Sequence, residues 1–335
     1  MTLASFRQMP NTQSTPLALS RHFYSQRGLT MVELLVALVV SLLISLAAIA
    51  ALVVTRQGFT AVDAASQLRD NGRFVHDLIQ RLGVQSGFKD VLYAAAPPPP
   101  SVSGLASNPP PNVSGFNDGE ASASDPLNVF TARAAADFSH SDILILRYQP
   151  AETVPGSGVT DRSMSDCSGN STAIPSTDRY DRMWSVIHVA DSLGEPSLMC
   201  SRVSAAGVIT TEPIIKDVEN FQVLYGFDAA GDSVPETYRR ADELIVANPV
   251  TTNANWRRVR SIRVGMVIRG PVNSAQDKTA QTFYPFGPAK NSSTGAVGSA
   301  LSSALDRGTV FLPGADGRLR QVVTFTVHLR NEQGL

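Results

Sequence analysis

The feature that most constrains this chain is an uninterrupted apolar segment near its N-terminus. Residues 29–54 (LTMVELLVALVVSLLISLAAIAALVV) contain no Lys, Arg, Asp, Gly or Pro, and as a helix these 26 residues span roughly 39 Å at about 1.5 Å per residue. That length exceeds the hydrocarbon core of a bilayer, which is about 30 Å thick. The apolar residues surround the helix instead of forming one stripe, which excludes the buried face of a soluble amphipathic helix. We therefore predict that residues 29–54 cross a membrane.

The charges before this segment predict its orientation. Residues 1–28 carry Arg7, Arg21 and Arg27 and no acidic residue, so the positive-inside rule keeps this end in the cytoplasm and exports the rest of the chain. An ordinary secretory signal has a shorter apolar core, of about 7–15 residues, followed by small residues at the cleavage site. The sequence at 48–50, Ala-Ile-Ala, supplies such a site, and removal of the whole segment is the alternative.

One carboxylate, Glu33, lies inside the apolar segment. A charge at the centre of a bilayer costs on the order of 3 kcal/mol, although Glu33 is close enough to one end to reach the headgroups. The acid is therefore either tolerated near the membrane surface or has a role of its own.

The residues around Glu33 match a known signal. The sequence RGLTMVE (27–33), followed by the long apolar run, resembles the leader-cleavage site of type IV pilins and of type II secretion pseudopilins. In that family a membrane enzyme, the prepilin peptidase, cuts after the glycine and methylates the new N-terminus. The resemblance implies that Gly28 is the last leader residue and that Leu29, where Phe is commoner, is the first mature, N-methylated residue.

The resemblance also gives Glu33 a role in assembly. In the family the glutamate of one subunit meets the amino group of its own or a neighbouring subunit as helices leave the bilayer for a filament. Cleavage after Gly28 would leave such an amine at Leu29, and opposite charges stabilise each other far more in a low-dielectric environment than in water. We expect Glu33 to be the charge-pairing residue of assembly.

Net charge and cysteine content limit the exported part. The formal net charge of −1 becomes −4 once the leader's three arginines are removed, which argues against a basic surface for nucleic acid. The chain has two cysteines, Cys167 and Cys200, and in an oxidising compartment they most simply pair with each other. Such a bridge would stabilise the fold by about 3–4 kcal/mol. Two separate buried thiols are the alternative.

Residues 55–87 continue the helix with a different pattern. Apolar and small residues recur at steps of three and four, which predicts an amphipathic helix that packs on a sheet and ends between Gly83 and Gly87. The stripe consists of Ala61, Ala65, Leu68, Gly72, Val75, Ile79 and Leu82.

The remainder, 88–335, is predicted to be a β-rich domain. Six apolar or alternating runs are typical of antiparallel strands: 141–148, 183–191, 196–203, 219–228, 256–270 and 321–331, the second and third forming a hairpin with its turn at 192–195. Residues 93–130, rich in Pro, Ser, Gly and Asn, and 271–309 are predicted to be exposed insertions. The expected fold class is α+β and type IV pilin-like, with a long N-terminal helix packed on an antiparallel sheet.

No pattern in the sequence indicates an enzyme. The histidines outside the leader belong to no metal or nucleophile motif, and His140-Ser141-Asp142 cannot act as a triad because adjacent strand residues face opposite ways. The acidic stretches 118–120 and 228–232 offer carboxylates to a cation, but ordinary turns explain them better. We expect no catalytic residue, no metal and no cofactor.

The downstream strands sharpen the family resemblance. The order VENFQVLYGFD (218–228), WRRVRSIRVGMVIRG (256–270) and VVTFTVHLRN (322–331) resembles the PilW family of minor pilins. This implies a bacterial inner-membrane protein with one span and a periplasmic C-terminal domain, which initiates or caps a type IV pilus and later resides in it. The implied partners are the prepilin peptidase, other minor pilins, the major pilin and a PilY-type tip adhesin, and not nucleic acid. The alternatives are a GspJ-like minor pseudopilin of type II secretion and a membrane-anchored periplasmic enzyme or binding protein that never assembles.

Overall fold

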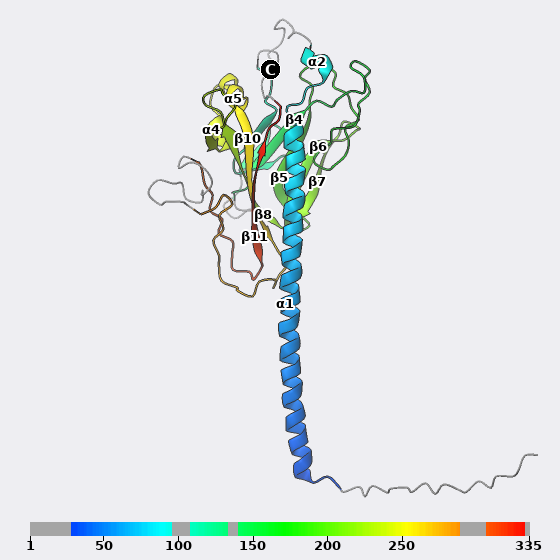
Figure 1. Cartoon of the computed structure of the whole chain (residues 1–335), viewed down its shortest axis with the longest axis vertical. Helices are drawn as coiled ribbons and strands as arrows, with labels where there is room; N and C mark the ends of the chain where they lie inside the picture. Colours follow the sequence, from blue (N-terminus) through cyan, green and yellow to red (C-terminus); the bar gives the residue numbers. More distant parts are fainter. Residues whose placement is uncertain (1–27, 96–107, 133–139, 289–305, 332–335) are drawn as a thin grey trace, which may run out of the picture. The chain divides into compact units, whose positions relative to one another are not determined.

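The computed structural model describes residues 28–95, 108–132, 140–288 and 306–331. The chain divides into two compact units, one ending at Val54 and the other beginning at Thr55. Helix α1, Met31–Gln85, contributes residues to both units (Figure 1).

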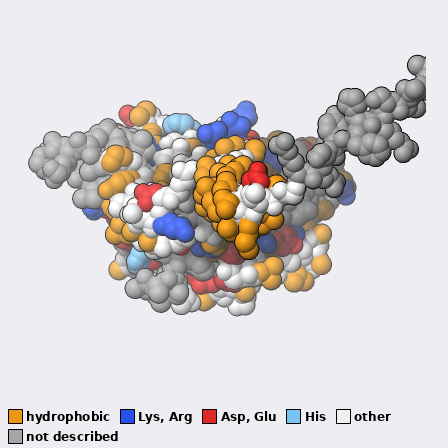
Figure 2. Space-filling view, turned by 90° about the horizontal axis from the view of Figure 1, so that it is seen from below, with side chains coloured by type: hydrophobic (Ala, Val, Ile, Leu, Met, Phe, Trp, Pro, Cys, Tyr) orange, Lys and Arg blue, Asp and Glu red, His pale blue; other side chains and the backbone are white. Residues whose placement is uncertain are grey.

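In the N-terminal unit the described residues are 28–30 and the first 24 residues of α1, and all of their side chains are exposed. Within the described part of the chain, α1 is the one helix long and apolar enough to cross a membrane. Apolar side chains cluster around the end of this helix (Figure 2). The hydroxyls of Ser41 and Ser45 donate to the main-chain oxygens of Leu38 and Ser41, so these polar groups are satisfied inside the helix.

The C-terminal unit contains, among its described residues, three antiparallel sheets. The five-stranded sheet has the order β1-β4-β5-β6-β7, with β1 Val113–Phe116, β4 Ile143–Tyr148, β5 Met183–Ser192, β6 Glu195–Val203 and β7 Ile209–Lys216. The four-stranded sheet has the order β11-β10-β8-β9, with β8 Val218–Phe227, β9 Thr237–Arg239, β10 Val259–Arg269 and β11 Arg320–His328. The small sheet pairs β2 Gly119–Ala121 with β3 Phe130–Ala132, and the short helices are α2 Val91–Ala95, α4 Ala241–Leu244 and α5 Pro249–Trp256.

The second half of α1 packs on the sheets through most of the predicted stripe, but Ala64 is buried where Ala65 was expected, and Ala61 is only half-buried. Two glycines let the helix approach β11 closely. A Cβ added at Gly72 would lie 2.8 Å from a methyl group of Val323, and one at Gly83 would lie 2.7 Å from a methyl group of Val327. The second half of the helix and the inner faces of both large sheets share one apolar core, so this half of α1 is integral to the C-terminal unit.

The six predicted strands correspond to β4, β5, β6, β8, β10 and β11. The predicted β5–β6 hairpin is confirmed, because Ser192 pairs with Glu195 across the turn. Leu193 and Gly194 have φ angles of 59° and 83°, the left-handed backbone that matches a two-residue turn to the twist of its strands.

The prediction of an exposed insertion over 93–130 is wrong for residues 113–116. Val113 is fully buried and β1 pairs with β4, so the main chain of this segment is satisfied by the sheet edge. Residues 96–107 lie outside the described residues.

The second predicted insertion, 271–309, also contacts the core. Residues 271–288 contain no named strand, but Phe286 is 1% exposed and packs with Leu224 and Tyr238. Residues 289–305 lie outside the described part.

Candidate functional site

The N-terminus of α1 is built around Thr30 and Glu33. The main-chain N–H and the hydroxyl of Thr30 both donate to Glu33 Oε2 at 3.1 Å, and the N–H of Glu33 donates to Thr30 Oγ1 at 3.3 Å. This reciprocal arrangement is a capping box, which satisfies main-chain donors that have no partner inside the helix. The carboxylate also lies at the positive end of the helix dipole. This role of Glu33 was not predicted, although the spacing T-x-x-E at 30–33 is its sequence signature.

Gly28 and Leu29 directly precede the capping box. Leu29 is 76% exposed, and a Cβ built on Gly28 would meet nothing within 4 Å. In the N-terminal unit the structure therefore brings Gly28, Leu29, Thr30 and Glu33 together in one exposed stretch of six residues. Cleavage after Gly28, methylation of Leu29 and pairing of Glu33 with an amine remain predictions.

Cys167 and Cys200 are joined by a disulfide, with their Cα atoms 5.7 Å apart. Cys200 lies in β6 and is fully buried, whereas Cys167 lies in the irregular segment before β5 and donates its main-chain N–H to Ser185 Oγ at 3.1 Å. The bridge therefore ties a segment without named strands to β6, an inner strand of the five-stranded sheet.

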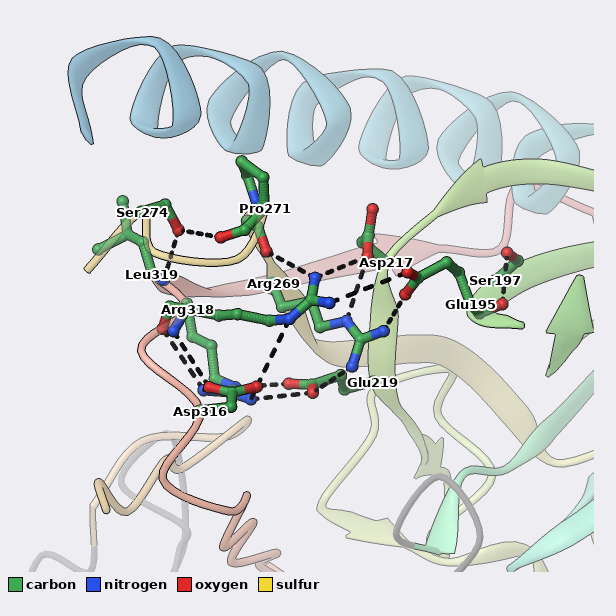
Figure 3. A network of polar contacts seen from close by, with 12 residues as sticks. Glu195, Ser197, Asp217, Glu219, Arg269, Pro271, Ser274, Asp316, Arg318 and Leu319 are labelled. Atoms are coloured by element: carbon green, nitrogen blue, oxygen red, sulfur yellow. Dashed lines mark hydrogen bonds and ion pairs between the residues drawn. The ribbon is translucent and has the colours of Figure 1, made fainter. Parts of the chain in front are cut away.

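A network of three arginines and four carboxylates connects the two large sheets to each other at one end (Figure 3). Its members are Arg269, Arg318, Arg320, Glu195, Asp217, Glu219 and Asp316. Arg269 contacts three of the acids: Nε donates to Asp217 at 3.1 Å, Nη1 donates to Glu219 at 3.2 Å, and Nη2 donates to Glu195. Because Glu195 begins β6 and Arg269 ends β10, this arginine links one sheet to the other.

Arg320 holds the other half of the network. It donates through Nε and Nη2 to the two oxygens of Glu219, and through Nη1 and Nη2 to Asp316 at 2.8 and 2.7 Å. The hydrogen bonds from Arg320 hold the pKa of Asp316 below its usual value. Arg318 is farther from its acids, at 3.6–3.9 Å. The network is a structural clamp whose strength depends mainly on Arg320 and Arg269.

The residues at 140–142 form no triad. His140 Nδ1 lies 2.7 Å from Asp118 Oδ2, while Ser141 Oγ accepts from the main chain of β8 at 3.1 Å. The Asp142 carboxylate accepts from the N–H of Asp118 at 3.0 Å and from a second N–H of β8 at 2.8 Å. Burial raises the pKa of Asp142 to about 7. Ser141 and Asp142 therefore fasten the start of β4 to residues 221–223.

The acidic turn after β8 brings Asp228, Asp232 and Glu236 together, with their oxygens within 4.8 Å of one another. The buried Asp228 carboxylate already accepts from Arg260 Nε at 3.0 Å and from two main-chain N–H groups of the turn. Glu236 accepts from two more, at 2.6 and 2.9 Å. These contacts support the interpretation of this stretch as a structural turn.

Two regions of the chain match known family profiles. Residues 186–331 match the profile of Type IV Pilus-assembly protein W (PilW), and residues 24–49 match the prokaryotic N-terminal methylation motif. These two matches support a PilW-like type IV pilin. No curated protein matches it. Among solved structures, a type IV-like pilin from Thermus thermophilus is 14% identical, and the alignment covers 80% of this chain and 98% of that chain with a TM-score of 0.36.

The two matched regions contain different features of the chain. The methylation motif includes Gly28, Leu29 and Glu33, and the PilW region extends from β5 to β11 with the arginine network inside it. The family points to a structural protein and not to an enzyme. The motif implies processing by the prepilin peptidase, and with the apolar helix it indicates membrane anchoring and association with a pilus.

Proposed function

We propose that this pilin is a minor subunit that initiates or caps a type IV pilus, and that it is cleaved after Gly28 and assembled through α1. The observation that carries the proposal is the apolar surface of α1 up to Val54, exposed along its whole length, with a single carboxylate, Glu33, in its first turn. Neighbouring helices of a filament would cover such a surface once it leaves the lipid.

The capping box suggests how Glu33 combines two tasks. Both hydrogen bonds from Thr30 use Oε2, which leaves Oε1 for a second donor. In the mature chain the amine would lie at Leu29, one residue before Thr30. Glu33 would then cap its own helix through one oxygen and accept the amine of its own or a neighbouring subunit through the other, a charge-assisted contact.

The proposed layout has four parts. The leader, 1–28, stays in the cytoplasm, and 29–54 form the single membrane span. The helix continues over 55–87 into the periplasm, where 88–335 form the β-rich domain. Its partners would be the prepilin peptidase, other minor pilins, the major pilin and a tip adhesin.

A GspJ-like pseudopilin of type II secretion is the main competing function, because both systems share the leader and the long helix. The match of residues 186–331 to the PilW profile favours the pilus. A membrane-anchored periplasmic protein that never assembles would leave the role of Glu33 unexplained. Minor pilin genes beside this gene would support the pilus, and secretion genes would support the pseudopilin.

The test compares two substitutions of Glu33. Glu33→Ala removes both the cap and the charge, whereas Glu33→Gln keeps an oxygen that accepts from Thr30 and removes only the charge. Both variants should be cleaved and inserted normally, yet neither should enter filaments in a strain that lacks the wild-type copy. If Glu33→Gln restores normal piliation, charge pairing is wrong; if both variants do, the proposed mode of assembly fails.

A further inference from the structure

The edge strands of the two large sheets differ in how they are protected. Native proteins block strand addition at sheet edges with short strands, prolines or bulges. Strand β1 has 4 residues and β9 has 3, while β7 contains Pro213 and pairs with β6 through a register shift. In contrast, β11 has 9 residues and pairs with β10 in continuous register. Its segment 321–327, QVVTFTV, contains neither a charge nor a proline.

The register shows which groups of β11 face outward. The main-chain N–H of Leu329 donates to the main-chain oxygen of Arg260 at 2.9 Å, and this pair continues the register of the β10–β11 ladder. Along antiparallel strands, hydrogen-bonded pairs alternate with pairs that are not hydrogen-bonded. The odd-numbered residues of β11 therefore bond to β10. The N–H and C=O groups of the even-numbered residues point to the outer edge: Val322, Thr324, Thr326 and His328.

A groove of about 440 Å³ lies between β11 and the second half of α1. Its lining contains no acidic residue and consists of Arg69, Gly72, Arg73, His76, Gln321, Val323, Thr324 and Phe325. Arg69 and Arg73 are exposed and form no ion pair with the described residues. The ring of His76 contacts Phe325 edge-on at a centroid distance of 4.8 Å. The groove thus combines an apolar floor with a cationic rim.

We propose that the outer edge of β11 takes up an extended segment of another pilin subunit, with carboxylate side chains directed towards Arg69 and Arg73. The open main-chain groups supply the hydrogen bonds of an added strand, and the two arginines select an acidic one. A second copy of this chain is the poorer occupant, because symmetric pairing of two β11 edges brings like-charged rims together. The inference rests on the proposed function, which supplies neighbouring subunits.

The test uses the full-length chain in its host, with a photoreactive amino acid at His328, an exposed edge residue. Irradiation should yield an adduct that mass spectrometry assigns to an acidic segment of a different pilin-type subunit. Thr324→Pro removes an outward N–H without breaking the β10 ladder and should lower the adduct yield by about tenfold or more, the loss expected from one or two main-chain hydrogen bonds. Thr324→Val loses the same hydroxyl but keeps the N–H, and should leave the yield unchanged.

A charge variant tests the same contact without a change in the strand. Arg69→Glu combined with Arg73→Glu should lower the adduct yield to a similar degree, whereas Arg81→Glu, an exposed arginine that lines a different groove of α1, should not. Equal yields from Thr324→Pro and the wild type, no adduct, or an adduct with a second copy would overturn the inference. If Glu33 variants block piliation while Thr324→Pro changes nothing, strand addition alone fails; normal piliation of the Glu33 variants would count against the proposed function itself.

Discussion

Gly28 is the residue on which the maturation of the chain depends in this account. A Cβ on Gly28 meets nothing within 4 Å, so a larger side chain there causes no clash with the described residues, and its effect on processing can be measured separately from packing. Gly28→Val should leave a full-length precursor in the inner membrane, because the peptidase must accommodate the residue before the cut. An immunoblot of membranes that shows normal maturation would contradict this prediction.

Asp142 should make stability depend on pH. Its pKa is raised by burial from 3.8 to about 7, so the unfolded carboxyl ionises near pH 4 while the folded one keeps its proton. The contribution of the protonated Asp142 to the free energy of unfolding is therefore complete below about pH 4 and is lost as the pH rises towards 7. Melting temperatures of the wild type and of Asp142→Asn should show the wild type losing its advantage across this window. A constant difference between the two would refute the assignment.

At the scale of elements, the disulfide fastens an irregular segment to β6. The cysteines are 33 residues apart, and closing such a loop is worth about 3–4 kcal/mol in the chain-entropy account. A reducing agent should lower the melting temperature of the wild type but not that of the double variant Cys167→Ser, Cys200→Ser. Alkylation that detects two free thiols in the unreduced protein would rule the bridge out.

The arginines of the network should contribute unequally to the stability of the fold. Arg320 is 6% exposed and contacts two carboxylates through four hydrogen bonds. Arg320→Ala leaves Glu219 with Arg269 alone and Asp316 with the more distant Arg318, and should destabilise the fold by about 3 kcal/mol. Arg318 approaches its acids only to 3.6 Å, and Arg318→Ala should cost about 1 kcal/mol or less. Denaturant midpoints of the two variants give the comparison, and equal losses would contradict this ranking.

The strands differ in how far the sequence could predict them. Strands such as β10, with Ile262, Val264, Met266 and Ile268 on one face, carry a periodic signal of their own. In contrast, β1 is only four residues long and follows a proline-rich stretch, and β7 contains Pro213. Both strands form because a neighbouring strand satisfies their main-chain hydrogen bonds. The arginine network could not be predicted either, since its members lie at strand ends and in adjoining segments that are far apart in the sequence and that only the sheet order brings together.

At the scale of the whole molecule, the size of the domain after the helix limits where in a filament the subunit fits. Residues 88–335 correspond to a radius of gyration of roughly 18 Å by compact-domain scaling, against about 13 Å for a 100-residue head. In a helical filament every head must fit within the spacing set by the N-terminal helices, and a head of this bulk would crowd its neighbours. The crowding disappears at an end of the filament. Deletion of the gene should therefore reduce filament number more than filament width, as counted by electron microscopy.

The central claim is that this chain is cleaved after Gly28 and assembled as a rare subunit of the filament. Quantitative mass spectrometry of sheared filaments tests it most directly. We expect an N-terminal peptide that begins with N-methylated Leu29, at a small fraction of the abundance of the main subunit. Absence of the protein from the filaments, or its presence as their most abundant component, would contradict the account.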